Sequence, residues 1–160
     1  MSLQDFAQRL SETKLSEALT DSTWAFPAIE SVHVIAITLV VGSIAIVDLR
    51  LLGWASRGRD ARELIRSILP VTWSAFALAL ATGSLLFVAN PISYAANFYF
   101  LGKMALLLVA GLNMALFHAF SHRHLSREGA VLPKLSGGAS LTLWITIVAF
   151  GRWIGFTLSQ

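Results

Sequence analysis

Residues 24 to 52 read WAFPAIESVHVIAITLVVGSIAIVDLRLL, a long apolar stretch interrupted by three ionisable residues, Glu30, His33 and Asp48. The hydrocarbon core of a bilayer is about 30 Å thick, and a helix needs about 20 apolar residues to cross it. An ionisable side chain at that depth costs roughly 2.5 kcal/mol or more unless it finds a partner. The stretch therefore predicts a membrane-spanning helix whose polar residues face protein and not lipid.

The spacing of these residues places them on one face of the helix. At about 100° per residue, positions 30, 33, 37, 41, 44 and 48 fall within about 80° of arc, so the three polar residues share one stripe with Ile37, Val41 and Ile44. Two interpretations follow from this stripe. The polar side chains make hydrogen bonds between helices and nothing more, or they form a buried functional site.

The composition supports an integral membrane protein. Apolar residues make up 56% of the 160 residues and charged residues only 13%, against about 25% charged residues in soluble domains. The absence of cysteine excludes disulfides, thiolate metal sites, iron–sulfur clusters and cysteine nucleophiles. The net charge of +3 is not the signature of a nucleic-acid-binding protein, and no nucleotide-binding or hydrolase motif occurs.

Four apolar segments predict four membrane-spanning helices, at residues 26–52, 68–89, 98–121 and 137–158. Residues 2–20 alternate apolar and polar side chains at helical spacing, which predicts an amphipathic helix lying on the membrane surface. No internal repeat is evident. We therefore predict an all-α fold with a single transmembrane domain over residues 1–160, an integral membrane four-helix bundle preceded by an interfacial helix.

The distribution of positive charge predicts the orientation. Residues 50–66 hold five arginines and residues 122–134 hold two arginines and a lysine, whereas residues 90–97 hold neither. Lys and Arg are enriched in cytoplasmic loops. The two basic loops should therefore be cytoplasmic, with both termini outside.

Once the orientation is set, position along each helix gives depth, at about 1.5 Å per residue. Counted from the outer ends of the first, third and fourth helices, His33, Lys103 and Arg152 lie five or six residues deep. Glu30 lies three residues deep. These four residues, which we call the outer polar layer, are predicted to converge near the outer leaflet.

The outer polar layer suits haem b. In membrane helix bundles an imidazole nitrogen can ligate the iron, and cations can balance the porphyrin carboxylates. His33 and His118 differ by about 14 residues in depth, or roughly 20 Å, so they cannot ligate the same iron. We predict His33 as the iron ligand, with Met104 at the same depth as a second ligand. Lys103 and Arg152 are predicted partners of the carboxylates.

Two further residues complete this predicted site. Glu30 would accept a hydrogen bond from the ring of His33 and so orient it, and Trp153 would supply an apolar wall. Two alternatives stay open. The protein could handle copper or another metal on Glu30 and His33, or on His118. It could also be an oligomeric proton or ion channel or transporter that uses the outer polar layer.

Four segments carry a resemblance to known families: WAFPAIESVHVIAITLVVGSIAIVDLRLLG, TGSLLF, FLGKMALLLVAGLNMALFH and GRWIG. Over about residues 24–156 the chain resembles an uncharacterised family of small bacterial four-helix inner-membrane proteins. It is also loosely similar to the membrane bundles of copper-resistance and b-type cytochrome proteins. The first resemblance implies the bacterial inner membrane. The second implies haem binding for electron transfer or redox sensing with an unidentified redox partner.

We expect the protein to self-associate in the bilayer, because four helices offer little interior for the outer polar layer together with Asn113. Size-exclusion chromatography with light scattering in detergent should give a protein mass above that of one chain. A single species at the chain mass of 17.4 kDa would contradict this expectation.

Overall fold

The computed structural model describes residues 3–55, 58, 61–116 and 131–158. Every regular element in these ranges is an α-helix, which confirms the predicted all-α class. In chain order the helices are α1 (Leu3–Ser11), α2 (Lys14–Asp21), α3 (Ala25–Leu52), α4 (Ala61–Ala89), α5 (Pro91–Ala96), α6 (Phe98–Leu116) and α7 (Val131–Leu158).

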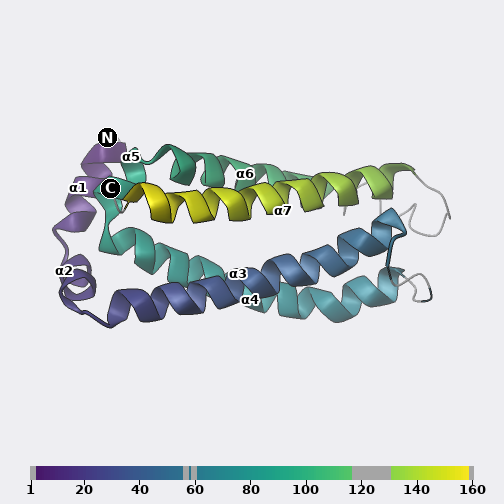
Figure 1. Ribbon diagram of the computed structural model, residues 1–160, viewed down its shortest axis with the longest axis horizontal. Helices are drawn as coiled ribbons and strands as arrows, with labels where there is room; N and C mark the ends of the chain where they lie inside the picture. The colour runs from purple at the N-terminus through teal and green to yellow at the C-terminus, as the bar shows by residue number, and fades with distance from the viewer. Residues whose placement is uncertain (1–2, 56–57, 59–60, 117–130, 159–160) are drawn as a thin grey trace.

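Four of these helices, α3, α4, α6 and α7, are long and apolar enough to cross a membrane. They run side by side along the long axis of the molecule (Figure 1). The hairpin of α3 and α4 and the hairpin of α6 and α7 are each closely packed, and α3 packs on α7 to join them. Over the described residues α4 and α6 have little or no direct contact. The side between α4 and α6 is therefore the least tightly closed.

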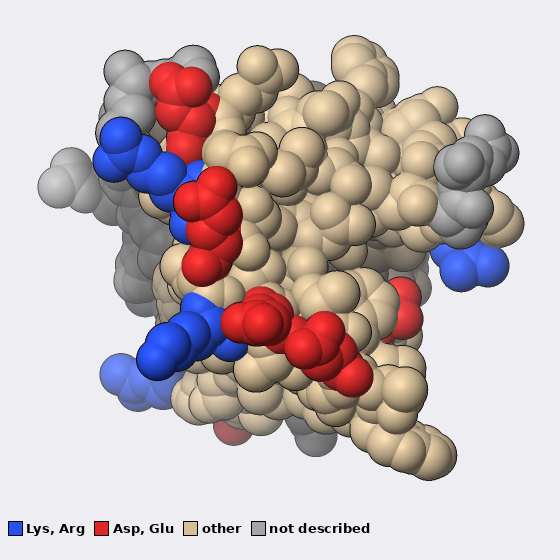
Figure 2. Space-filling view, turned by 90° about the vertical axis from the view of Figure 1, so that its left-hand side faces the viewer, with Lys and Arg blue, Asp and Glu red and all other residues tan. Residues whose placement is uncertain are grey.

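Both chain ends lie at the same end of the long helices, where α1 and α2 run across them (Figure 1). α1 packs on α5 and α2 packs on α4, and Thr20 Oγ1 donates a hydrogen bond to the Ala89 carbonyl oxygen at 3.2 Å. We call α1 and α2 together the cap of this end. Its residues Ala7, Ser16 and Leu19 are buried. Its outer surface carries interspersed acidic and basic side chains (Figure 2).

The N-terminal segment forms two helices where the sequence predicted one over residues 2–20. Thr13 has an extended backbone and its hydroxyl accepts a hydrogen bond from the Ser16 backbone N–H at 3.3 Å. This N-cap starts α2 in a new direction. Helical periodicity alone does not show such a break, because apolar residues recur at helical spacing on both sides of it.

The boundaries of the long helices also differ from the prediction. α4 begins at residue 61 and not 68, and α7 begins at residue 131 and not 137, because each helix continues into polar residues beyond its apolar core. Between the second and third spans, residues 91–96 form the short helix α5, which has Pro91 in its first turn. The predicted end of the third span, residues 117–121, lies outside the described residues.

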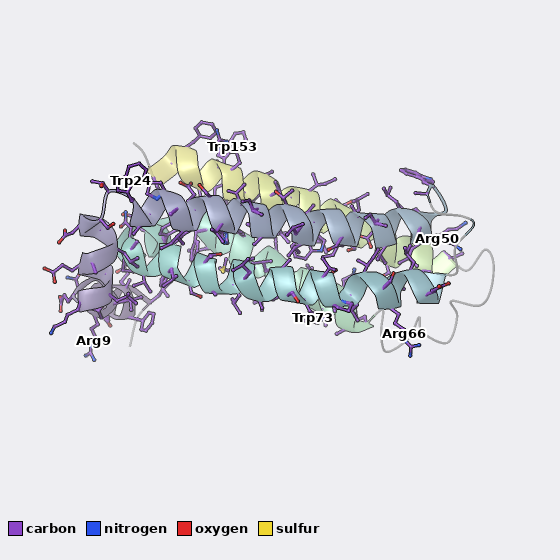
Figure 3. All side chains as sticks on the ribbon, turned by 90° about the horizontal axis from the view of Figure 1, so that it is seen from below. Arg9, Trp24, Arg50, Arg66, Trp73 and Trp153 are labelled. Atoms are coloured by element: carbon purple, nitrogen blue, oxygen red, sulfur yellow. The ribbon has the colours of Figure 1, made fainter. Side chains whose placement is uncertain are left out.

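Large aromatic side chains are exposed near both ends of the long helices. Trp24 and Trp153 project at the end that carries α1 (Figure 3), and Trp54 follows α3 at the opposite end. Trp and Tyr are enriched where membrane helices meet the headgroups. The exposed apolar flanks between these rings are consistent with contact to lipid chains.

Gly102 of α6 lies directly against the Phe150 ring of α7. A Cβ at Gly102 would lie 2.5 Å from Phe150 Cε1, whereas a Cβ at Gly111 of the same helix would meet nothing within 4 Å. Small residues at such contacts let membrane helices pack closely.

Replacing Gly102 with Ala should therefore push α7 from α6 and cost about 1–3 kcal/mol, the range for overpacked contacts. Thermal unfolding in detergent measures the effect. Gly111→Ala is the matched control and should be neutral or slightly stabilising, because alanine is the better helix former. Equal melting temperatures for the two variants would contradict the close contact.

Candidate functional site

His33 of α3 is half-buried and its ring is fixed by α4. Its Nδ1 lies 2.9 Å from Thr82 Oγ1. Thr82 Oγ1 also lies 2.7 Å from the Leu78 carbonyl oxygen, to which its hydroxyl can donate. With the hydroxyl proton on that carbonyl, Thr82 accepts a hydrogen bond from Nδ1–H of His33, and this is the tautomer that we assign. In the neutral imidazole this leaves the lone pair on Nε2.

The residue after Thr82 makes room for the same ring. A Cβ at Gly83 would lie 2.9 Å from Cε1 of His33, which is closer than carbon atoms approach without displacement. α4 thus supplies both the hydrogen-bond acceptor and a flat backbone surface against the imidazole. Such fixed orientation is typical of histidines that ligate metals, whose second ring nitrogen is held by a nearby acceptor.

Lys103 of α6 faces the interior from the other hairpin. Its side chain is half-buried, and a Cβ at Gly151 of α7 would lie 3.4 Å from Nζ. The positive charge of Lys103 acts electrostatically on His33. Lys103 is thus close enough to His33 for its charge to act on the imidazole, although the two residues lie on opposite hairpins.

Glu30 is exposed and lies one turn nearer the cap. Burial raises the pKa of the Tyr94 phenol in α5, and the carboxylate of Glu30 raises this pKa further. The phenol therefore stays neutral at physiological pH. The acceptor for the His33 ring is Thr82, whereas the sequence predicted Glu30 for that role.

The other predicted site residues lie on outward-facing sides of their helices. Arg152 is exposed, with its guanidinium carbon 4.5 Å from the centroid of the Phe156 ring. Trp153 is 52% exposed (Figure 3), and its ring centroid lies 6.3 Å from that of Tyr99 of α6. Met104 is 37% exposed. They share the depth of Lys103 but not its direction, because successive helical residues point about 100° apart.

His118 lies outside the described residues, so Asp48 is the remaining ionisable residue of the predicted stripe to be described. Between His33 and Asp48 the next polar contact is a hydrogen bond from Thr72 Oγ1 to Ser43 Oγ at 2.8 Å. The positions that separate it from His33 include three buried apolar side chains: Ala36, Val40 and Ala75. Apolar packing thus interrupts the polar stripe.

Sequence reasoning missed Thr82 as the partner of His33. Thr82 lies seven residues from Ala89, the outer end of α4, and His33 lies eight residues from the start of α3 at Ala25. The same depth count that paired Lys103 with His33 would therefore have found Thr82. The small side chains of the TGS segment instead suggest a packing role alone.

Comparison with known protein families gives a match over residues 22–157 to a model described as a family of unknown function (DUF6644). The match begins directly after α2 and includes all four long helices. No curated protein and no solved structure matches the chain.

Replacing Thr82 with Val should free the tautomer of His33 and leave Nδ1–H without its acceptor, at a cost of about 1–3 kcal/mol. Nitrogen NMR of protein labelled at histidine, with His33→Ala to assign the signals, should show a single Nδ1-protonated form in the wild type. The Thr82→Val spectrum should show a mixture of tautomers. Thr82→Ser retains the hydroxyl and should keep the wild-type spectrum, and an unchanged Thr82→Val spectrum would contradict the assignment.

Proposed function

The chain belongs to DUF6644, a family of unknown function, and from its own residues we propose that it is a membrane-embedded haem b-binding protein. In this proposal Nε2 of His33 ligates the iron. The observation that carries it is the 2.9 Å contact between His33 Nδ1 and Thr82 Oγ1, which in the tautomer assigned above leaves the lone pair on Nε2. Imidazole nitrogen is the commonest protein ligand of haem iron in such bundles.

Haem suits this layer better than a free metal ion does. The described residues contain no group of three or more His, Cys, Asp and Glu side chains that could hold an ion. Protein sites for zinc or copper usually draw three or four such ligands. A porphyrin brings four nitrogen ligands of its own and needs only one or two from the protein. One oriented histidine is therefore enough.

Lys103 would balance the charge of the bound group. An ammonium in the hydrocarbon region costs roughly 2.5–3.5 kcal/mol when it is unpaired, and the porphyrin carries two carboxylates. Lys103 reaches the region of His33 from the opposite hairpin. The side between α4 and α6, where the helices are least closely packed, lies between the elements that carry Thr82 and Lys103.

Bound haem would supply a one-electron couple, so the proposed role is electron transfer or redox sensing. We place the protein in a bacterial inner membrane with the basic loops in the cytoplasm and both termini outside. His33 then lies near the outer leaflet, within reach of a redox partner on that side. We also propose that the protein forms a homo-oligomer, because its four spans bury few of their side chains.

Optical absorption of protein purified from haem-sufficient cells tests the proposal. The wild type should show a Soret band, and His33→Ala should lose it because Nε2 is the iron ligand. Val34→Ala, at the exposed neighbouring position, is the control for that change. Lys103→Gln should weaken haem retention several-fold without abolishing it, whereas Lys134→Gln, an exposed lysine in α7, should have no effect.

A colourless wild-type protein would overturn the haem assignment. The ion-pathway interpretation would then become the stronger one, and flux in liposomes dependent on His33 would test it. A Soret band that survives in His33→Ala would instead place the iron on another ligand.

A further inference from the structure

Asp48 is a buried carboxyl group that the proposed haem site does not use. It lies fifteen residues after His33 on α3, which corresponds to about 22 Å along the helix. Its side chain is only 4% exposed. Ser140 of α7 donates a hydrogen bond to it. Among the residues that the structure describes, Oδ2 has no hydrogen-bond partner.

Close helix packing surrounds Asp48. A Cβ at Gly137 of α7 would lie 3.2 Å from the Asp48 carbonyl oxygen and 3.1 Å from Leu51 Cβ. α7 therefore rests directly on the backbone of α3 at this level. The contact shields the carboxyl group from bulk water, which raises the cost of a negative charge there.

Among the described residues at this end of the molecule, the other charged side chains do not share its position. Arg50 follows on α3 but projects from a different face, because residues two apart do not face each other on a helix. Glu63 and Arg66 of α4 and Lys134 of α7 are exposed, and Arg66 points away from α3 (Figure 3). The described part of α6 has no charged residue at this depth.

The interior of a helix bundle can provide hydrogen-bond partners for a protonated carboxyl group more easily than for an ionised one. A carboxylate only accepts hydrogen bonds, and within helices the backbone N–H groups are already used. A carboxylic acid donates, and backbone carbonyl oxygens can accept a second hydrogen bond. Hydroxyls in this chain do this repeatedly: Ser31 donates to the Pro27 carbonyl at 2.8 Å and Thr38 to the Val34 carbonyl at 2.8 Å.

We propose that Asp48 is a proton-binding site, a carboxylic acid that carries its proton on Oδ2 while α3 and α7 are packed together. Ionisation then places an unpaired negative charge at the crossing and loosens it. The ligand is a proton and not a metal cation, because among the described residues no group of three or more His, Cys, Asp and Glu side chains could hold an ion. A metal cation such as Ca²⁺ takes about six or more oxygen ligands.

Infrared spectroscopy of the full-length protein in nanodiscs tests this site. At neutral pH the wild type should show the carbonyl stretch of a protonated carboxylic acid, shifted in D₂O and absent from Asp48→Asn. Ser140→Ala should move the band to higher frequency, because the carbonyl loses a hydrogen bond. Glu63→Gln, which changes an exposed carboxyl group at the same end, should leave the band unchanged. A wild-type spectrum without the band would overturn the proposal.

Thermal unfolding against pH provides the second measurement. As alkaline pH removes the infrared band, the melting temperature of the wild type should fall. The melting temperature of Asp48→Asn should not fall over the same pH range, because its amide stays neutral. Stability that depends on sodium concentration at constant pH would assign the site to a cation and contradict a proton. Neither readout involves haem absorbance, so this proposal and the haem proposal can fail independently.

Discussion

Hydrogen-bond donors are scarce inside a bundle of helices, and this scarcity determines how each buried polar residue of the protein is arranged. Backbone N–H groups are used within the helices, while carbonyl oxygens keep a free lone pair. The Thr82 hydroxyl gives its proton to the carbonyl of Leu78 and is left as an acceptor. His33 meets this acceptor with Nδ1–H. Asp48 has no proton to offer when ionised, and one of its oxygens finds no donor among the described residues.

Glycine decides where the helices come close enough for these contacts. Gly83 lies against the imidazole of His33, and Gly137 lies against the backbone of Asp48. The first contact belongs to the α3–α4 hairpin, and the second joins that hairpin to α7. Lys103 of α6, whose Nζ lies beside Gly151 of α7, acts electrostatically on His33. The outer site is therefore formed between two hairpins and the inner one at their junction.

The sequence predicted the four long helices well and the directions of their side chains poorly. Apolar length gave the four long helices, and counting from their ends placed His33 and Lys103 in one layer. The same count placed Arg152 and Trp153 there, but both point outward, since the side of a helix that meets protein depends on how its neighbours pack. An apolar membrane helix gives little signal of that side, because lipid and protein interior are both apolar. The break between α1 and α2 depends on a single cap at Thr13.

The two buried polar positions are linked mechanically and not by a polar path. Between the contact of His33 with Thr82 and that of Ser43 with Thr72, the interior is filled by Ala36, Val40 and Ala75. A chain of hydrogen bonds cannot cross such apolar packing. Both positions nevertheless lie on α3, a continuous helix from Ala25 to Leu52. A change in the α3–α7 crossing at Asp48 would therefore reach His33 as a tilt or shift of α3 against α4. The close contact of Gly83 with the His33 ring would oppose this movement.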